Sequence, residues 1–372
     1  MINPFKYGRV VSDEDFCSRP VLQKELARCI TSAQNVLVEG ERRTGKTSLI
    51  IETVRNLKNY RHLYIDCFEI KSVEDLFRRI VNALLHNEHQ APPFATILKA
   101  LSHLRPVVSV DPLTGMPSVS INTFTDAQPD SLDSVMDLIG TTFKKRNVVI
   151  VFDEFQDILQ LKEQRQVLAL LRGKIQFQST ISYVFAGSVR NTMHDIFYDP
   201  TSPFFKSAVT ITVGDIPRER FSEFITAKFL HHGRRKIGME MLDILFTITQ
   251  EVPGDVQELC AAVWDSSLPN RTVDRECIPA ALELIYSREH RIYESHLSLI
   301  TGQQLRCLVS LARRGGKNPY SVDFINDSGI RQPGSIRKAI QRLLDLRIIY
   351  LFNKEHKFVN PFFRYWLLSK GY

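Results

Sequence analysis

The sequence lacks any apolar run approaching the roughly 18 residues that a membrane span requires. It begins MINPFKYGRVVSDEDF, without the basic-then-apolar layout of a signal peptide, so we expect a cytoplasmic protein with no membrane contact. Glycine and proline number only 17 each, which excludes collagen-like and low-complexity chains. A chain of 372 residues, 44% of them hydrophobic, is expected to form a globular protein of two or three domains.

Cysteine is also scarce, and its spacing is uninformative. None of the six cysteines forms a C-x-x-C pair or lies near a histidine at metal-ligand spacing, which indicates neither a zinc site nor a disulfide framework. We therefore expect all six to be buried free thiols and not reactive ones: Cys17, Cys29, Cys67, Cys260, Cys277 and Cys307.

The net charge of +7 is unevenly distributed. Residues 297–372 contain 13 Lys/Arg and 4 Asp/Glu, whereas the rest of the chain contains 35 Lys/Arg and 37 Asp/Glu. All of the basic excess therefore lies in the last fifth of the chain. This asymmetry predicts a C-terminal module that faces a polyanion, attached to a near-neutral body.

Short apolar and β-branched runs alternate with helical segments in the first 214 residues. Such alternation predicts an α/β domain, a parallel sheet with helices on both faces. The strands are expected at 35–39, 62–68, 147–152, 181–186 and 209–213, with helices at 47–57 and 72–85. Residues 106–110 and 117–121 alternate apolar with small or polar residues across DPLTG, so a hairpin insertion is predicted at about 104–124.

Strand signals stop after Gly214. An all-helical lid domain is predicted for 215–296, with helices at 217–231, 240–249, 254–266 and 277–296. A winged helix-turn-helix is predicted for 297–372, with helices at 302–313, 321–328 and 333–346 and strands at 348–352 and 357–359. Residues 1–214 are then the first domain.

Residues 40–47, GERRTGKT, match the phosphate-binding pattern G-x-x-x-x-G-K-[ST] between an expected strand and an expected helix. Backbone N–H groups of such a P-loop wrap the phosphates, the lysine reaches the β- and γ-phosphates, and the threonine can bind Mg²⁺. The pattern predicts a P-loop NTPase that uses ATP and Mg²⁺. The expected nucleotide contacts are Gly40, Arg42, Arg43, Thr44, Gly45, Lys46, Thr47 and Ser48.

A P-loop requires a second acidic element at the end of an apolar strand, and residues 148–154, VVIVFDE, supply it. Asp153 is expected on the metal together with Thr47, and Glu154 is expected to polarise the attacking water. If one of these carboxylates only capped the N-terminus of the next helix, the presence of that one would be explained, but not the presence of two in a row. The doublet therefore favours hydrolysis over nucleotide binding alone.

Three strings together resemble a known family: GERRTGKTSLI, VIVFDEFQDI and FAGSVRNTM. They are similar to the archaeal-type branch of the AAA-related and STAND P-loop ATPases, relatives of the origin-recognition ATPases. The Asp-Glu-Phe-Gln string is the most specific part. An N-terminal pattern of that branch is matched by Asn3, Pro4, Phe5, Gly8, Phe16, Arg19 and Leu26.

The resemblance implies further site residues. Ser188 occupies the sensor-1 position, and the turn at Val252, Pro253, Gly254 and Asp255 resembles a sensor-2 and proline motif that contacts nucleotide from the lid. Val10, Val11 and Phe16 would line the adenine pocket. Strand-end polarity, a helix-starting turn and ordinary core packing are the structural alternatives.

Related proteins often carry an arginine finger for the neighbouring subunit after sensor 1. This sequence has Lys206 there, and Arg190 is the competing candidate. Lysine lacks the bidentate fork of arginine, so a homo-oligomer with trans-acting catalysis stays open, and either residue can be an ordinary surface charge.

Residues 333–346 are the expected recognition helix, with Ile336, Ile340, Leu343 and Leu344 facing the core. The polar face and the wing suggest contact with DNA phosphates and the major groove. The DNA-binding candidates are Ser335, Arg337, Lys338, Gln341, Arg342, Lys354 and Lys357. A basic winged helix that packs on protein instead is the alternative.

These features predict a Mg²⁺-dependent ATP-hydrolysing switch whose nucleotide state controls a DNA-binding winged helix. The main alternative is a STAND-like signalling or antiphage-defence scaffold whose winged helix mediates contacts with a protein effector and oligomerisation. A transcription factor with a regulatory nucleotide site is a third alternative, and it requires a strong sequence preference.

Overall fold

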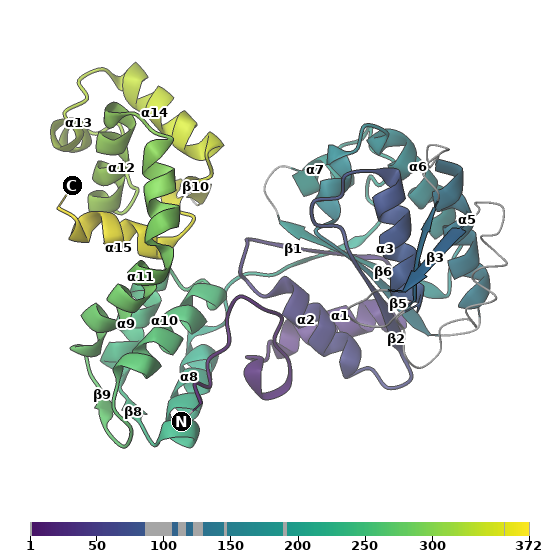
Figure 1. Ribbon diagram of the computed structural model, residues 1–372, viewed down its shortest axis with the longest axis horizontal. Helices are drawn as coiled ribbons and strands as arrows, with labels where there is room; N and C mark the ends of the chain where they lie inside the picture. Colours follow the sequence, from purple (N-terminus) through teal and green to yellow (C-terminus); the bar gives the residue numbers. More distant parts are fainter. Residues whose placement is uncertain are drawn as a thin grey trace. The chain divides into compact units, whose positions relative to one another are not determined.

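The computed structural model describes residues 2–85, 106–110, 117–121, 129–144, 147–188, 192–352 and 354–371. The chain folds into two compact units (Figure 1). We call Val10–Asp215 the sheet unit, and Met1–Arg9 together with Ile216–Tyr372 the helical unit. Within these described ranges, none of the helices combines the length and the apolar composition that a membrane-spanning helix needs.

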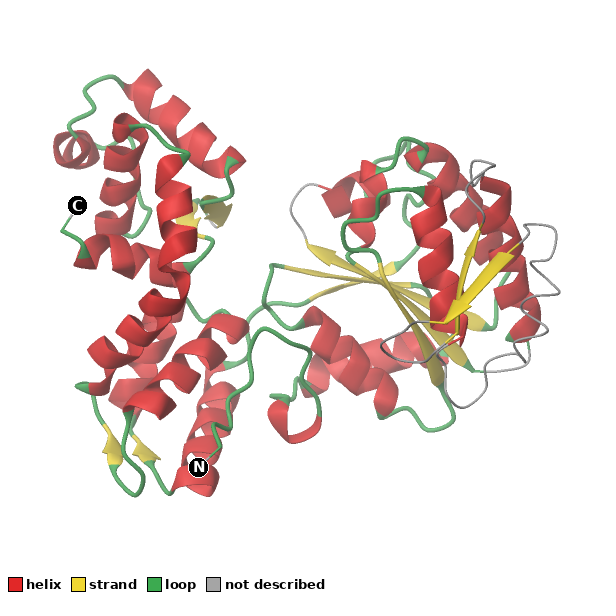
Figure 2. Cartoon of the chain, in the orientation of Figure 1, coloured by secondary structure: helices red, strands yellow, loops and turns green. Residues whose placement is uncertain are grey.

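Five parallel strands form the sheet of the sheet unit (Figure 2). They are β1 (Val36–Gly40), β2 (Arg61–Asp66), β5 (Val148–Asp153), β6 (Ile181–Ser188) and β7 (Val209–Thr212). Their order is β2-β5-β6-β1-β7, so the first strand of the chain lies between the fourth and the fifth. The predicted parallel sheet is confirmed, and every residue of β5 and β6 is buried, as continuous apolar strands require.

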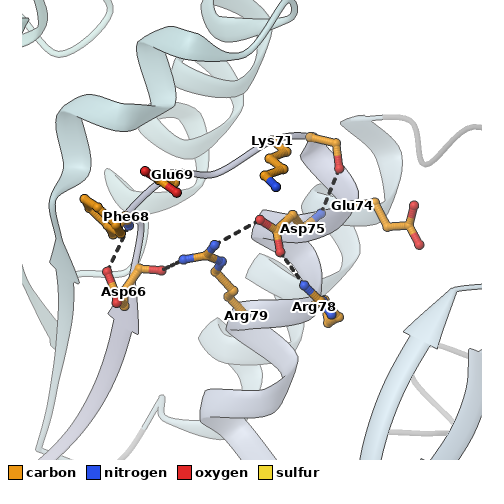
Figure 3. A pocket seen from close by; sticks show the side chains of 9 residues that line it. Asp66, Phe68, Glu69, Lys71, Glu74, Asp75, Arg78 and Arg79 are labelled. Carbon is orange, nitrogen blue, oxygen red and sulfur yellow. Dashed lines mark hydrogen bonds and ion pairs between the residues drawn. The ribbon is translucent and has the colours of Figure 1, made fainter. Parts of the chain in front are cut away.

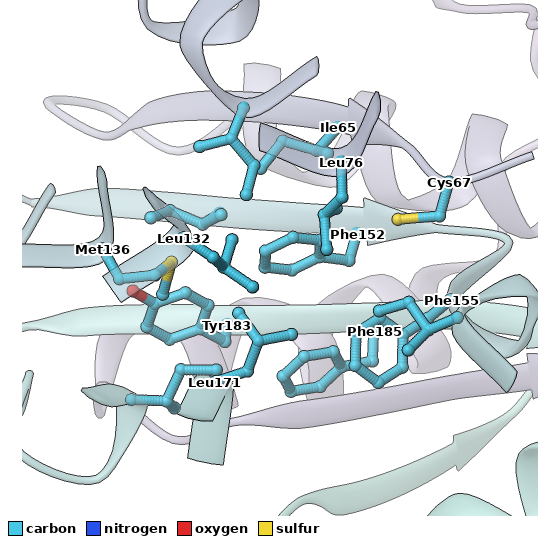
Figure 4. Close-up of a cluster of buried hydrophobic side chains, with 14 of the residues drawn as sticks. Ile65, Cys67, Leu76, Leu132, Met136, Phe152, Phe155, Leu171, Tyr183 and Phe185 are labelled. Carbon is cyan, nitrogen blue, oxygen red and sulfur yellow. The ribbon is translucent and has the colours of Figure 1, made fainter. Parts of the chain in front are cut away.

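Helices cover both faces of this sheet. One apolar cluster packs α1 (Pro20–Thr31) and α2 (Lys46–Arg55) against the first face. The other packs α3 (Val73–Leu85), α5 (Pro129–Thr142), α6 (Gln164–Ile175) and α7 (Thr192–Phe197) against the second. Figure 4 shows the aromatic centre of this second cluster, where the Phe152 and Phe185 rings are 5.9 Å apart and Phe155 lies beside them. This packing fixes the positions of the strand ends, where the polar residues lie.

The boundaries of the predicted elements differ from the observed ones by at most two residues. Helices α1, α5, α6 and α7 are additional; α1, for example, buries only Leu26, Cys29 and Ile30, so its apolar face is too narrow to stand out in the sequence. Strands β3 (Pro106–Val110) and β4 (Pro117–Ile121) pair antiparallel as the hairpin pattern predicts. The turn and the flanks of that hairpin lie outside the described residues.

Four helices form residues 216–298 of the helical unit: α8 (Arg218–Gly233), α9 (Met239–Thr249), α10 (Pro253–Ser266) and α11 (Cys277–Ser298). Two short strands, β8 (Lys236–Ile237) and β9 (Thr272–Val273), pair parallel between them and were not predicted. The N-terminal residues also pack here. Phe5 is buried against Phe229, with ring centroids 4.8 Å apart, and the Asn3 amide donates to Ala261 O at 3.0 Å.

The C-terminal part forms the predicted winged helix. It contains α12 (Gly302–Arg314), α13 (Val322–Ser328), α14 (Pro333–Asp345) and the antiparallel strands β10 (Ile349–Phe352) and β11 (Glu355–Phe358), followed by an additional helix, α15 (Pro361–Ser369). Strand β11 begins two residues earlier than expected, because Glu355 already pairs with Phe352. Lys357 therefore lies within the strand, opposite Tyr350, and not beside the turn.

Candidate nucleotide-binding site

Polar residues from three neighbouring strands meet at the carboxyl edge of the sheet. In the strand register, Gly40 lies opposite Ser188, and Asp66 lies opposite Asp153. Since β1 ends at Gly40, the loop that follows it emerges at this edge. Ligands of open parallel sheets bind at such edges, next to the strand where the order reverses.

The loop of residues 40–45 connects β1 to α2 through a left-handed residue. Gly45, with φ of 85°, caps α2, and α2 begins at Lys46. The Thr44 hydroxyl donates to Glu41 O at 2.8 Å, and the buried Lys46 ammonium donates to Gly40 O and Glu41 O at 3.0 Å each. Burial lowers the pKa of Lys46, while Glu154 and Asp153 act in the opposite direction. The lysine is thus held at the helix N-terminus, where phosphates are favoured.

Asp153 joins the loop to the sheet. Its Oδ2 atom accepts hydrogen bonds from Thr47 Oγ1 and from the Tyr64 hydroxyl, both at 2.6 Å. Burial of the phenol, together with the adjacent Asp153 carboxylate, raises the pKa of Tyr64, so the Tyr64 hydroxyl stays a hydrogen-bond donor. A hydroxyl and a carboxylate side by side are hard oxygen ligands, so this donor pair fits Mg²⁺.

Glu154 follows Asp153 in a left-handed conformation, with φ of 49°. Its Oε2 atom accepts a hydrogen bond from the side-chain amide of Gln156, which is only 8% exposed. Gln156 Oε1 lies against Gly187, where a Cβ atom would stand 2.3 Å from it. Gln156 therefore connects the carboxylate to the end of β6.

Ser188 is the last residue of β6 and lies at the same edge. It is 7% exposed, and its hydroxyl has no hydrogen-bond partner among the described residues. A buried hydroxyl without a partner is costly unless a ligand or water satisfies it. Its position opposite Gly40 therefore fits a polar contact to a phosphate or to water.

Arg19 forms hydrogen bonds that hold the loop of residues 40–45 in place. Its guanidinium donates to Gly214 O at 3.0 Å and also to Thr44 O. The side chain is 5% exposed, and burial lowers the pKa of Arg19 to about 10. The phosphate-binding loop is thereby joined to the last residues of the sheet unit.

A family model described as "ATPase domain predominantly from Archaea" matches residues 23–244, more than half of the chain. The chain belongs to this archaeal-type ATPase family. The resemblance predicted from the motifs is confirmed. A second model, described as "Probable winged helix domain", matches residues 291–369.

Comparison with curated proteins gives no match. Among solved structures, the Walker-type ATPase PABY2304 of Pyrococcus abyssi is 16% identical, with 98% of this chain and 99% of that chain covered and a TM-score of 0.65. The Orc1 protein of Aeropyrum pernix, in complex with DNA, is 13% identical, with coverages of 96% and 94% and a TM-score of 0.53. The Orc2 protein of Aeropyrum pernix, in ADPNP–ADP complexes, is 11% identical, with coverages of 99% and 98% and a TM-score of 0.54. At these identities the comparisons establish a shared fold.

The N-terminal segment of this archaeal-type ATPase runs along α2. Val11 N donates to the Ser48 hydroxyl at 3.1 Å, and Asp13 N donates to Glu52 at 3.0 Å. Phe16 is half-buried against the core, whereas Val10 is 49% exposed. The backbone of this segment is thus tied to the helix that follows the phosphate-binding loop.

Other predicted site residues lie apart from this cluster. Lys206 is exposed, and its ammonium lies 5.3 Å from the centroid of the Phe205 ring. Arg190 lies outside the described residues, and Arg42 and Arg43 are exposed on the loop. Pro253 is the first residue of α10 in the helical unit.

The winged helix of this ATPase exposes the polar face predicted for α14. Arg337, Lys338 and Arg342 are exposed and form no ion pair with the described residues, whereas Gln341 donates to Asp345 at 2.9 Å. Ser335 is half-buried, Lys354 is exposed, and the Lys357 ammonium lies 4.6 Å from the centroid of the Phe352 ring. On the core side Ile336, Ile340 and Leu343 are buried, and Leu344 is half-buried.

Three residues of the site, Tyr64, Gln156 and Arg19, have roles that were not predicted from the sequence. Gln156 and Arg19 belong to the strings that carry the family resemblance, so the motif was the available signal. Tyr64 gave no signal, because only the pairing of β2 with β5 brings its hydroxyl to Asp153.

A hollow of about 680 Å³ opens beside the site, between the end of β2 and the start of α3 (Figure 3). Arg78 and Arg79 line it, and both are paired with Asp75 at 2.6 and 3.0 Å. Arg79 also donates to Asp66 O. The hollow is lined by three cationic side chains but by four carboxylates, those of Asp66, Glu69, Glu74 and Asp75, and by no residue of the loop 40–47. This lining fits a triphosphate less well than the loop of residues 40–47 does.

Proposed function

We propose that this archaeal-type ATPase is a Mg²⁺-dependent ATP-hydrolysing switch whose nucleotide state controls the DNA contact of its winged helix. The observation that carries the proposal is the 2.6 Å hydrogen bond between Thr47 Oγ1 and Asp153 Oδ2. It brings together two chain segments that a P-loop ATPase needs in one place.

The loop accounts for binding. Lys46 would exchange the carbonyls of Gly40 and Glu41 for phosphate oxygens, with no change in its position at the start of α2. Thr47 and Asp153 would hold Mg²⁺, which when bound supplies positive charge at the β- and γ-phosphates. The N-terminus of α2 adds the favourable end of the helix dipole.

Glu154 accounts for hydrolysis. A water oxygen attacks the γ-phosphorus, the bond to the β–γ bridging oxygen breaks, and Glu154 accepts the proton of the water while ADP leaves. Gln156 holds Glu154 in one orientation, and the Ser188 hydroxyl is placed to orient the water or a γ-phosphate oxygen. Positioning of this kind is the main contribution of a protein to phosphoryl transfer.

The exposed cations of α14 support a DNA partner. Arg337, Lys338 and Arg342 present three charges on the helix that reads the major groove in winged helices. The Orc1 protein of similar fold is in complex with DNA. The family resemblance further assigns Pro253, at the start of α10, a role in sensing the nucleotide, and it assigns Lys206 or Arg190 a role toward the nucleotide of a neighbouring subunit.

A second candidate is the signalling or defence scaffold. Leu351 and Phe352 of the wing are 59% and 38% exposed, and an apolar wing suits a protein partner. In this case ATP would change the oligomeric state without DNA, and hydrolysis would be slow.

ATPase turnover with and without duplex DNA, at two salt concentrations, separates the two candidates when mass photometry follows the same samples. DNA-stimulated turnover that falls steeply with salt supports the first, and ATP-dependent assembly without DNA supports the second. Lys46→Ala should abolish tight ATP binding, whereas Glu154→Gln should bind ATP and retain it. Unimpaired turnover in Glu154→Gln would refute the general-base assignment.

A further inference from the structure

Residues 216–296 carry their charges in separate regions. They contain 10 Lys/Arg and 13 Asp/Glu, so this part of the helical unit is acidic as a whole. Yet residues 224–239 contain no Asp or Glu but four Lys/Arg, and residues 266–273 contain no acid and one arginine. Two stretches without acidic residues, almost 30 residues apart in the sequence, thus hold five of the ten Lys/Arg.

The fold brings these two stretches together. Strands β8 and β9 pair parallel, with Lys236 opposite Thr272. Lys236 N donates to Arg271 O, and Asn270 N donates to Gly233 O, both at 3.2 Å. We call Arg234, Lys236 and Arg271 the cationic tip; all three are exposed, and none forms an ion pair with the described residues.

A buried arginine anchors the cationic tip. Arg235 is 4% exposed, its guanidinium lies 3.8 Å from the centroid of the Trp264 ring, and it donates to the Ser267 hydroxyl at 2.9 Å. Gly233 packs so closely on the same indole that a Cβ atom would stand 2.5 Å from it. Because the backbone between them is anchored, the exposed cations lose less conformational freedom when they bind a ligand.

We propose that the cationic tip binds the phosphate backbone of duplex DNA, as a second contact in addition to that of α14. Unpaired cations on an anchored backbone suit phosphates, whose contacts position a protein without reading sequence. The core of a protein interface favours exposed Phe, Tyr and Trp, and the described residues of β8, β9 and their flanking turns expose none of these. Leu268 and Met239 are exposed nearby, so the choice of DNA rests on the three unpaired cations. The proposal rests on the proposed DNA-binding function and extends it.

The two contacts are spatially separate within the helical unit. Figure 1 shows β8 and β9 at one end of this unit and α14 at the other. Each is therefore expected to neutralise its own phosphates, and their contributions to the salt dependence should add.

The test is fluorescence anisotropy of a labelled duplex over a series of salt concentrations with the full chain. The tip variant is Arg234→Ala/Lys236→Ala/Arg271→Ala, and the α14 variant is Arg337→Ala/Arg342→Ala. The control, Arg218→Ala/Arg220→Ala/Arg291→Ala, removes three exposed arginines elsewhere in the same unit, of which Arg218 is ion-paired with Asp243. Thermal unfolding of each variant, monitored by circular dichroism, checks that the variant folds.

We expect the tip variant to lower the slope of log K against log salt by about 2 to 3, and the control to leave it unchanged. A tip variant that binds like the control would overturn the proposal, and an acidic protein partner would give this result. Loss of binding in the tip variant but not in the α14 variant would support the tip and refute the winged-helix contact. A wild-type chain that binds no duplex would refute both, while its ATPase activity would still be measurable.

Discussion

The side-chain amide of Gln156 donates a hydrogen bond to Oε2 of Glu154, so the string that supplies the carboxylate also supplies the group that orients it. Gln156 is buried and lies against Gly187, next to Ser188. Orientation of the proposed base is therefore coupled to the end of β6, where the γ-phosphate of ATP is expected.

Gln156→Ala should lower kcat for ATP hydrolysis about tenfold, because Glu154 loses its fixed orientation. The affinity for ATP should stay within about twofold, because the Gln156 amide donates its hydrogen bonds to Glu154 and Asp157, and neither of these residues belongs to the loop 40–47. Steady-state ATPase assays and titration with a fluorescent ATP analogue measure the two quantities. Gln160→Ala, at the exposed end of the same turn, is the control. A tenfold loss of affinity with unchanged kcat would contradict the assignment.

Arg19→Lys should destabilise the sheet unit and weaken ATP binding. Lysine cannot reach Thr44 O and Gly214 O with two separate N–H groups, so one buried carbonyl loses a charged donor, at a cost of about 1.5–3 kcal/mol. Urea unfolding and nucleotide titration test this, with Arg28→Lys on the exposed face of α1 as the control. Equal stability of the two variants would show that the guanidinium bridge contributes little.

Phe5→Ala should reduce the unfolding free energy of the helical unit by roughly 3 kcal/mol, because the ring is 3% exposed and packs on Phe229 and Trp264. Tryptophan fluorescence during urea unfolding measures this change, since both tryptophans of the chain, Trp264 and Trp366, belong to the helical unit. Ile2→Ala removes a side chain that is 85% exposed and should have no effect. If both variants behave like the wild type, the N-terminal segment is not part of the unit's core.

The helical unit should lose stability as the pH falls below about 6.5. Burial lowers the pKa of His296 and of His356 from the model-peptide value of 6.5, although a hydrogen bond involving Gly316 acts in the opposite direction at His356. The unfolded chain then binds more protons than the folded one, so stability rises with pH through this range. Thermal melts at pH 7.5 and 5.5 should differ less for His296→Gln/His356→Gln than for the wild type. An unchanged difference would exclude these two histidines as its source.

Local signals in the sequence determined the parts of this protein that depend on neighbouring residues. The loop of residues 40–47, the strand before Asp153 and the alternation of strands and helices are all short patterns, because a phosphate-binding loop and a buried strand each impose their residues within one segment. The recognition helix could be predicted from the sequence for the same reason, since Ile336, Ile340 and Leu343 repeat at helical spacing.

Only the tertiary structure decided which distant residues complete these patterns. Tyr64 reaches Asp153 through the pairing of β2 with β5, and Arg19 reaches Thr44 across the loop. The cationic tip joins residues 234–236 to Arg271, which neither stretch indicates alone. The physical reason is that strand register and helix packing are set by the burial of the whole core, so side chains far apart in sequence meet only once the chain is folded.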